Sequence, residues 1–287
     1  MSVPTQTVVL GAGYLAHFLH EAMPRTAPVT WVRRTRPAAG ARLDHVALDV
    51  TRAADVARLG SVIDGALARV TALDVVFMLP PSGLGSAVPA VALAPLLAML
   101  RARPVRRAVV ISSSGIYEED DGACIDATTP VAPRSPRAQR LDAIEQAWRA
   151  ALDEVSVLRF AGIYGPGRVI GRDAVLSGKP LPGAPEAWLN LIHAADGARA
   201  IVAALRLAHT LPLGLIADGN PVRRGDYYAA LAALLGAAPA QFSGAAQARG
   251  RSKRLDPRAS WNALGCAPQW PDYRLALATL VGADDAC

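Results

Sequence analysis

Apolar runs alternate with segments of helical spacing through the first 160 residues of the chain. Runs rich in β-branched and apolar residues are typical of buried strands, and they occupy residues 7–10, 29–32, 46–50, 73–79, 107–111 and 155–160. Apolar residues recur with helical spacing at 14–22, around 93–100, and at 137–152. Strands that alternate with helices in this way predict an α/β fold with a doubly wound parallel sheet, in which ligands bind beyond the carboxyl ends of the strands.

The pattern changes beyond Tyr164, where short elements alternate with proline and glycine turns. We expect strands at 188–192 and 213–217, and helices at 194–207, 224–235, 257–264 and 273–281. This half is too irregular to repeat the first. We therefore predict a nucleotide-binding domain at 1–163 and a smaller substrate-binding region at 164–287, interleaved with the first domain. The polar, proline-rich segment 118–137 predicts a loop whose length favours a lid or a substrate-binding role.

The stretch 6–22, QTVVLGAGYLAHFLHEA, places a glycine turn between a strand and a helix. Gly11 allows a sharp turn off the strand, and Gly13 removes a Cβ so that a pyrophosphate can approach the backbone. The start of the helix then offers unpaired N–H groups and a partial positive charge. Ala16 replaces a third glycine and is small enough for close helix–strand packing. This context predicts dinucleotide binding.

The second strand is followed at once by an arginine cluster, Arg33 to Arg36. At this position an acidic residue would hydrogen-bond the ribose hydroxyls of NAD, whereas arginine accommodates the 2′-phosphate of NADP. NADP is therefore the expected cofactor, with NAD less favoured; a solvated basic loop is the structural alternative. Asp49 ends the third strand, and it either lies at the adenine edge or caps the next helix, which starts near Thr51 or Arg52.

Composition narrows the function classes further. The hydrophobic content of 52% with 19% charged residues fits a folded globule, and the net charge of +6 comes almost entirely from arginine. The arginines are scattered with few aromatic residues beside them, so nucleic-acid binding is the minority interpretation. The basic segment 249–254 would be the site of such binding. The three cysteines lie far apart, which predicts neither a metal site nor a disulfide framework. A signal segment and a membrane span are not expected, so we expect a cytoplasmic protein with a small-molecule substrate and no membrane partner.

Several motifs occur in the order found in one large family. They are GAGYLA at 11–16, SSSGIY at 112–117, RFAGIYGPGR at 159–168, WLNLIHAADGARAIVAAL at 188–205, DGNPVRRGDYYAALAALLG at 218–236 and SKRLDPRASWNALGCAPQWPDYRLAL at 252–277. Over nearly its whole length the chain resembles the extended short-chain dehydrogenase/reductases of the NAD(P)-dependent epimerase/dehydratase superfamily. Within that superfamily it is most similar to the atypical, bacterial YeeZ-like branch. The resemblance implies a Rossmann domain followed by a smaller substrate domain, and a homodimer formed by helices near 91–101 and 138–151.

The resemblance also implies roles for individual residues. Pyrophosphate contacts would come from Gly11, Gly13, Tyr14 and Leu15, the 2′-phosphate would meet Arg33 and Arg34, the adenine would meet Asp49 and Val50, and Leu79 and Pro80 would pass near the ribose. Ser113 stands at the family's catalytic Ser/Thr position, and Tyr117 is a candidate proton donor if an arginine such as Arg140 approaches it. Arg168 and Asn190 are candidate substrate contacts. His193 begins a helix and is expected to anchor it by a hydrogen bond.

The chain departs from the family at the catalytic pair. Members that oxidise or reduce carbonyls use Tyr-x-x-x-Lys on the helix after the long loop, where the lysine lowers the pKa of the tyrosine. Here Arg137 and Leu141 stand at those positions, and the spacing occurs nowhere in the sequence. Two hypotheses follow: an NADP-dependent oxidoreductase or epimerase acting on a small polar metabolite, or an NADP(H)-binding sensor with impaired catalysis.

Overall fold

The computed structural model describes residues 4–36, 43, 45–244 and 252–284, and it divides into two compact units. Unit 1 comprises Met1–Ser113, Ser135–Arg159 and Ala198–Gly214. Unit 2 comprises Ser114–Arg134, Phe160–Gly197 and Leu215–Cys287. The chain thus passes between the units several times. No helix among the described residues is long and apolar enough to cross a membrane.

A seven-stranded sheet forms the centre of unit 1, as the alternating pattern predicts. Its strand order is β3-β2-β1-β4-β5-β7-β11, and neighbouring strands from β3 to β5 pair in parallel. The strands are β1 (Thr5–Leu10), β2 (Val29–Arg33), β3 (Val46–Ala47), β4 (Ala72–Phe77), β5 (Val105–Ser113), β7 (Val155–Phe160) and β11 (Leu213–Ile216). The chain order reverses between β1 and β4, and ligands of such sheets bind at this point.

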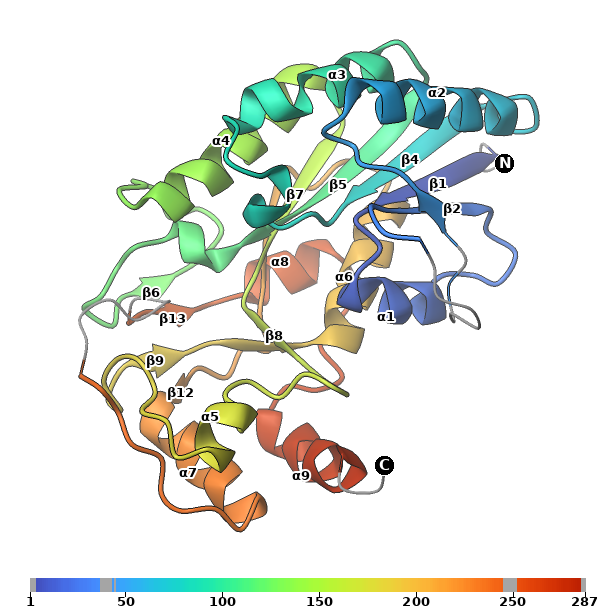
Figure 1. Cartoon of the computed structure of the whole chain (residues 1–287). Coiled ribbons are helices and arrows are strands. Elements are labelled where there is room, and N and C mark those ends of the chain that lie inside the picture. Colours follow the sequence, from blue (N-terminus) through green and yellow to red (C-terminus); the bar gives the residue numbers. More distant parts are fainter. Residues whose placement is uncertain (1–3, 37–42, 44, 245–251, 285–287) are drawn as a thin grey trace. The chain divides into compact units, whose positions relative to one another are not determined.

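Helices cover both faces of the sheet (Figure 1). On one face lie α2 (Ala53–Leu67), α3 (Pro89–Arg101) and α4 (Pro136–Ala151), and on the other lie α1 (Tyr14–Ala22) and α6 (Ala194–Arg206). Two short 3₁₀ turns, η1 (Pro81–Leu84) and η2 (Ser114–Ile116), follow β4 and β5. Every residue of β4 and β7 is buried, because a parallel sheet covered on both faces shields its central strands from water. The predicted doubly wound α/β fold is therefore confirmed.

The third strand is shorter than the predicted 46–50. The Leu48 amide still donates to the Arg33 carbonyl of β2 at 3.0 Å, and beyond it the Asp49 carboxylate accepts hydrogen bonds from Thr51 N at 3.0 Å and Thr51 Oγ1 at 2.7 Å. The Asp49 amide in turn donates to Asp55 Oδ2 at 3.0 Å. These bonds close a turn before α2 begins at Ala53, so Asp49 shapes the approach to the helix, whose N-cap is Arg52.

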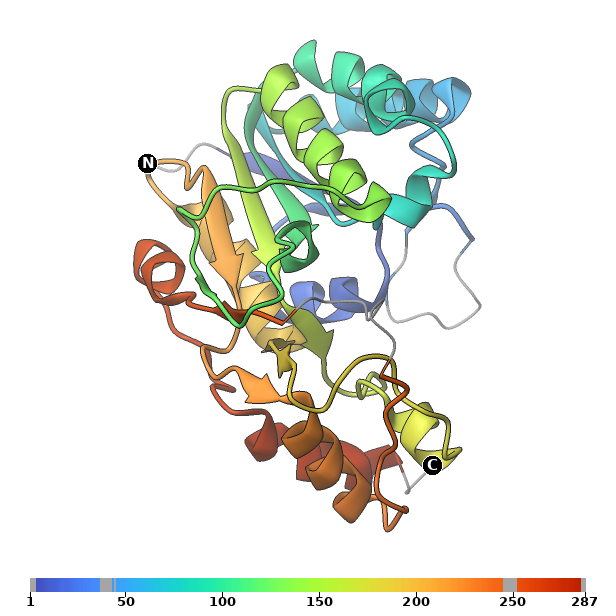
Figure 2. The same ribbon diagram turned by 90° about the vertical axis from the view of Figure 1, so that its left-hand side faces the viewer.

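Unit 2 consists of two-stranded pairs and short helices. The pairs join β8 (Gly162–Tyr164) to β10 (Leu191–His193), β9 (Trp188–Leu189) to β12 (Val222–Arg223), and β6 (Cys124–Ile125) to β13 (Arg254–Leu255). Its other helices are α5 (Arg172–Leu176), α7 (Arg224–Leu234), α8 (Arg258–Ala263) and α9 (Tyr273–Asp284). Helices α7 and α9 lie side by side (Figure 2), and the rings of Tyr227 and Tyr273 are 5.1 Å apart between them. The predicted strand 188–192 is two strands, because β9 and β10 pair with different partners.

Candidate nucleotide-binding site

The glycine turn after β1 has the geometry that its sequence predicts. Gly11 has φ +94°, a left-handed conformation that favours glycine. A Cβ at this position would lie 2.8 Å from Leu79 Cδ1 and 3.0 Å from the Leu79 amide nitrogen. The amides of Gly11 and Ala12 both donate to the Val32 carbonyl at 2.9 Å, which holds the turn against β2. Gly11 is thus required for both the turn and the close approach of the segment that follows β4.

Gly13 has a different role. It is the N-cap of α1 with φ −100°, and a Cβ there would find only the Gly11 carbonyl oxygen, at 3.9 Å. A hydrogen-bonding cap side chain is missing from this helix start, and its first turn contains no acidic residue. The positive end of the helix dipole is therefore not compensated locally and favours an anion. Ala16, in the place of a third glycine, is completely buried.

A cavity of about 300 Å³ opens beside this turn, within unit 1. Its walls come from four segments that the sheet brings together at the carboxyl ends of β1, β2, β3 and β4. They are Gly11 and Gly13; Val32 to Thr35; Leu48 to Val50; and Leu79, Pro80, Ser82 and Gly83. Of the ten residues predicted for the cofactor, Gly11, Gly13, Arg33, Arg34, Asp49, Val50, Leu79 and Pro80 line the cavity.

The other two predicted cofactor residues begin α1. Tyr14 is the first residue of the helix and Leu15 is buried, and neither lines the cavity. Sequence reasoning missed the lining residues Val32, Thr35, Leu48, Ser82 and Gly83. Four of them directly adjoin predicted residues or lie within two positions of one, so the signal was their place at or near the carboxyl end of a strand.

The cavity has a basic side. Arg33 and Arg34 both line it, and their residues are exposed to solvent. Asp49 also lines it: burial raises the pKa of its carboxyl, but the Thr51 hydrogen bonds and the nearby charges of Arg34 and Arg52 together lower that pKa overall. Asp49 is therefore ionised near neutral pH and can accept a hydrogen bond, while the guanidinium groups can meet an anion.

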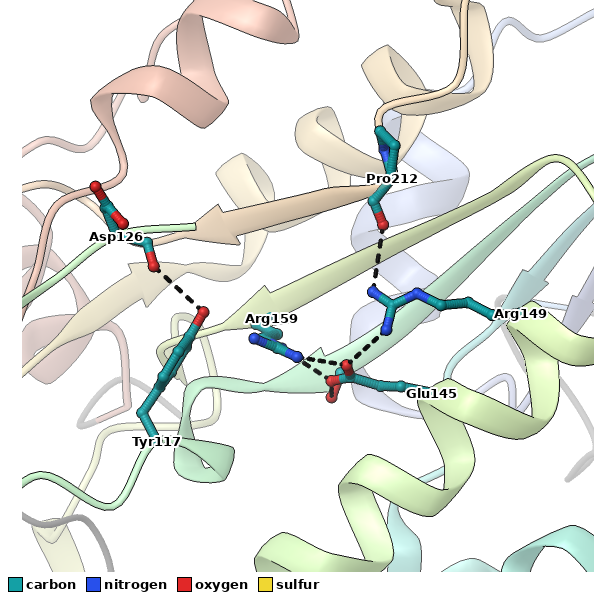
Figure 3. A network of polar contacts seen from close by, with 7 residues as sticks. Tyr117, Asp126, Glu145, Arg149, Arg159 and Pro212 are labelled. Atoms are coloured by element: carbon teal, nitrogen blue, oxygen red, sulfur yellow. Dashed lines mark hydrogen bonds and ion pairs between the residues drawn. The ribbon is translucent and has the colours of Figure 1, made fainter. Parts of the chain in front are cut away.

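The predicted catalytic Ser113 is the last residue of β5 and is half-buried. Its neighbour Ser112 is buried and donates to Glu145 Oε1 at 2.6 Å. Glu145, completely buried on α4, also accepts from Arg159 Nε at 3.0 Å and Nη2 at 2.7 Å, as Figure 3 shows. Arg149 approaches the same carboxylate at 3.5 Å. This buried ion pair fixes α4 against β5 and β7 at the end of the sheet where Ser113 lies.

Tyr117, the predicted proton donor, belongs to unit 2 and is only 1% exposed. Its hydroxyl donates to the Asp126 carbonyl oxygen at 3.3 Å (Figure 3), and its own carbonyl accepts from the buried Lys253 Nζ at 2.9 Å. The arginine suggested as its partner, Arg140, binds main-chain carbonyls of unit 1 instead. The surroundings of Tyr117 are those of a packed aromatic residue, the structural alternative to a catalytic role.

The predicted substrate contacts and His193 make main-chain bonds in unit 2. Arg168 Nε donates to the Ile163 carbonyl at 3.1 Å. The Asn190 amide group donates to Lys253 O at 2.9 Å and accepts from Leu255 N at 2.8 Å, so it connects β9 and β10 to the β13 segment. His193 Nδ1 accepts from Ala195 N at 3.3 Å, as expected for a residue that anchors the start of α6. The basic segment 249–254 lies outside the described residues except for its last three.

Unit 2 contains a buried acid near this histidine. Burial is the main cause that raises the pKa of Asp218 to about 8, and the charges of Asp272 and Asp196 add to it. Burial and the same three carboxyl groups also raise the pKa of Tyr164, and burial lowers the pKa of His193. Asp218, Tyr164 and His193 are therefore held in their neutral forms at pH 7.

A larger cavity, of about 690 Å³, opens in unit 1 near the amino ends of β5 and β7. Arg106, Arg107 and Arg149 line it, but their guanidinium groups are already engaged. Arg106 donates to Leu205 O at 2.9 Å, and Arg107 donates to Ala204 O at 3.1 Å and Leu207 O at 2.6 Å. The first two carbonyls belong to the last turn of α6 and the third directly follows it, and cations stabilise this end of a helix. The arginines of this cavity therefore have a structural explanation.

The fold and the glycine-turn cavity define a nucleotide-binding protein of the doubly wound type. Residues 7–214 match the family model of the NAD dependent epimerase/dehydratase family, and the chain belongs to this family. It is 32% identical to Protein YeeZ of Escherichia coli K12 over 178 residues; the match spans 60% of this chain and 61% of that protein, so the chain spans about three fifths of the length of the curated relatives it matches.

Two solved structures superpose on this chain over nearly its full length. A protein from Methylobacillus flagellatus, provisionally described as an NAD-dependent epimerase/dehydratase, superposes with a TM-score of 0.80 and 25% identity over 99% of this chain and 100% of that one. UDP-glucose 4-epimerase from Thermus thermophilus, solved with NAD, gives a TM-score of 0.77 at 20% identity over 97% and 98% of the two chains. At that identity the second likeness shows the fold.

Proposed function

We propose that this protein is an NADP-dependent oxidoreductase or epimerase that acts on a small polar metabolite. The observation that carries the proposal is the cavity beside the Gly11–Gly13 turn, which combines an open helix N-terminus with Arg33 and Arg34. A pyrophosphate fits against Gly13, where a missing Cβ leaves space, and a nicotinamide nucleotide bound there would supply hydride transfer.

The choice of NADP rests on the residues after β2. Arg33 and Arg34 stand where an acidic residue would bind the ribose hydroxyls of NAD. Both arginines line the same cavity as Asp49. Guanidinium groups form paired, charge-assisted hydrogen bonds to phosphate oxygens. The 2′-phosphate of NADP is the group that would use them, and NAD lacks it.

Calorimetric titration with NADPH and NADH tests the proposal. Wild-type protein should bind NADPH at least tenfold more tightly than NADH. The double variant Arg33→Ala/Arg34→Ala should lose that preference while its affinity for NADH stays unchanged. Arg36→Ala is the matched control, because Arg36 is exposed in the same cluster but does not line the cavity. Equal affinity of the wild type for both nucleotides would overturn the NADP assignment, and binding of neither would overturn the proposed function.

For catalysis, we propose that the Ser113 hydroxyl at the carboxyl end of β5 contacts the substrate. Tyr117 is the proposed proton donor. A screen of carbonyl substrates that follows NADPH absorbance tests turnover. Ser113→Ala should lower kcat strongly if this hydroxyl contacts the substrate. Tyr117→Phe tests the second role separately, since a packed ring without a catalytic role would leave the rate unchanged.

A second candidate function is NADP(H) sensing without turnover. The observation that favours it is helix α4, where the position of the family's lysine is occupied by Leu141, 3% exposed, and the position of its tyrosine by the exposed Arg137. Tight NADPH binding, no oxidation with any carbonyl substrate and a partner interaction that depends on NADPH would support sensing over catalysis.

A further inference from the structure

One wall of the nucleotide cavity is the connection between β4 and α3, residues 78–88. Leu79, Pro80, Ser82 and Gly83 of this connection line the cavity. Leu79 also lies directly against the Gly11 turn, where its amide nitrogen is 3.0 Å from the position of a Cβ on Gly11. The placement of this wall therefore determines the space beside the glycine turn.

The connection has few bonds of its own. It contains Pro80 and Pro81, which have no amide hydrogen to donate, and Gly85 adopts φ +64°. Its internal bonds run from Gly83 N to Pro80 O at 2.8 Å and, more weakly, from Gly85 N to Ser82 O at 3.3 Å. Leu84 anchors it to the core of unit 1. Residues 81–84 form only the short 3₁₀ turn η1, so the placement of the whole connection depends on contacts from outside it.

Arg140, on the neighbouring helix α4, supplies such contacts. Its Nη2 donates to Pro81 O at 3.1 Å and to Gly85 O at 2.8 Å, and its Nη1 donates to Ala87 O at 3.0 Å. The accepting carbonyls lie on both sides of the cavity-lining pair Ser82 and Gly83. Arg140 itself does not line the cavity. One guanidinium group therefore connects the two ends of the wall.

We infer that Arg140 is a positioning residue for the nucleotide, because it fixes the β4–α3 wall against which the ligand lies. The inference rests on the proposed function, since it assumes a dinucleotide in this cavity. Without Arg140 the wall samples other arrangements, and the apparent affinity falls in proportion to the fraction of molecules that keep the competent one. If about one molecule in ten keeps it, NADPH binds about tenfold more weakly.

Calorimetry with NADPH and with 2′,5′-ADP tests this role on the full chain. The smaller ligand carries the 2′-phosphate, which the Arg33–Arg34 side of the cavity would hold, and it lacks the nicotinamide half, so its binding should depend less on the β4–α3 wall. Arg140→Met should weaken NADPH binding about tenfold and leave 2′,5′-ADP binding within about twofold of wild type. Arg140→Lys should recover part of the loss, because an ammonium group can reach fewer of the carbonyls in a fixed geometry.

Arg101→Met is the matched control, because it removes an exposed arginine from the neighbouring helix α3, outside the cavity lining. It should bind both ligands as the wild type does. Unchanged NADPH affinity in Arg140→Met would overturn the inference, and so would an equal loss for both ligands, which would indicate general damage to the unit. Failure of the wild type to bind either ligand would instead overturn the proposed function.

Discussion

A single methyl group added at Gly13 should weaken nucleotide binding while leaving the free protein stable. The backbone at Gly13 has φ −100°, and the new Cβ would meet its nearest atom at 3.9 Å, an ordinary van der Waals distance. Replacing glycine by alanine at a compatible site changes stability by less than about 1 kcal/mol, often favourably. The same methyl group would project beside a pyrophosphate. Overpacking there costs about 1–3 kcal/mol, or roughly 5–150-fold in Kd for NADPH.

Gly11→Ala should give the opposite result. A positive φ costs a residue with a Cβ about 1–2 kcal/mol, and the close contacts with the Leu79 and Met78 backbone at 3.0 and 3.1 Å add about 1–3 kcal/mol. Unit 1 should therefore lose about 2–5 kcal/mol of stability.

Urea unfolding and NADPH calorimetry on the two variants separate these effects. Gly13→Ala should unfold at the wild-type midpoint and bind weakly, whereas Gly11→Ala should unfold early. NADPH binding of Gly13→Ala at wild-type affinity would refute the placement of the pyrophosphate against this residue. An unchanged midpoint for Gly11→Ala would refute the tight approach of β4 to the turn.

Other consequences concern stability. Between about pH 4 and about pH 8, Asp218 is neutral in the folded protein and ionised in the unfolded one. The free energy of unfolding should therefore fall as the pH rises from about 4 to about 8, by up to about 1.4 kcal/mol per pH unit. Its pH dependence across this range should be weaker for Asp218→Asn. Glu145→Ala leaves a buried arginine without its carboxylate and should cost about 3–5 kcal/mol in a denaturant titration. Gly197→Ala puts a Cβ 2.6 Å from a ring carbon of Phe160 and should lower the melting temperature, while Gly65→Ala, with open space around it, should raise it slightly.

The first half of the chain could be predicted because each element has a local signal. Strands such as β4 and β7 are continuous apolar runs, and the glycine turn shows in the sequence where a left-handed residue is needed. The third strand was predicted too long, since its end depends on the bonds between Asp49 and Thr51 rather than on hydrophobicity. Side-chain bonds of this kind leave no periodic pattern.

Unit 2 was less predictable because its pairs join distant residues. Cys124–Ile125 pairs with Arg254–Leu255 across about half the chain, and each strand is only two residues long. The segment 118–137, which was expected to be a loop, contains the strand β6. Similarly, Asn190 fits a substrate contact by its place in a motif, yet its amide group bonds to main-chain atoms near Lys253. A motif gives the position of a residue but not its partners.

Helix α4 lacks the catalytic pair that the family resemblance implies for it. The family resemblance implies a tyrosine and a lysine on this helix, and here those two positions hold the exposed Arg137 and the buried Leu141. A lysine at 141 would be buried in apolar surroundings, so the pair could not be restored by exchanging two side chains without a large cost in stability. Arg140 of the same helix instead supports the wall of the nucleotide cavity. If the proposed function holds, α4 contributes to the nucleotide site through Arg140, and the proton comes from another element, for which Tyr117 is the proposed donor.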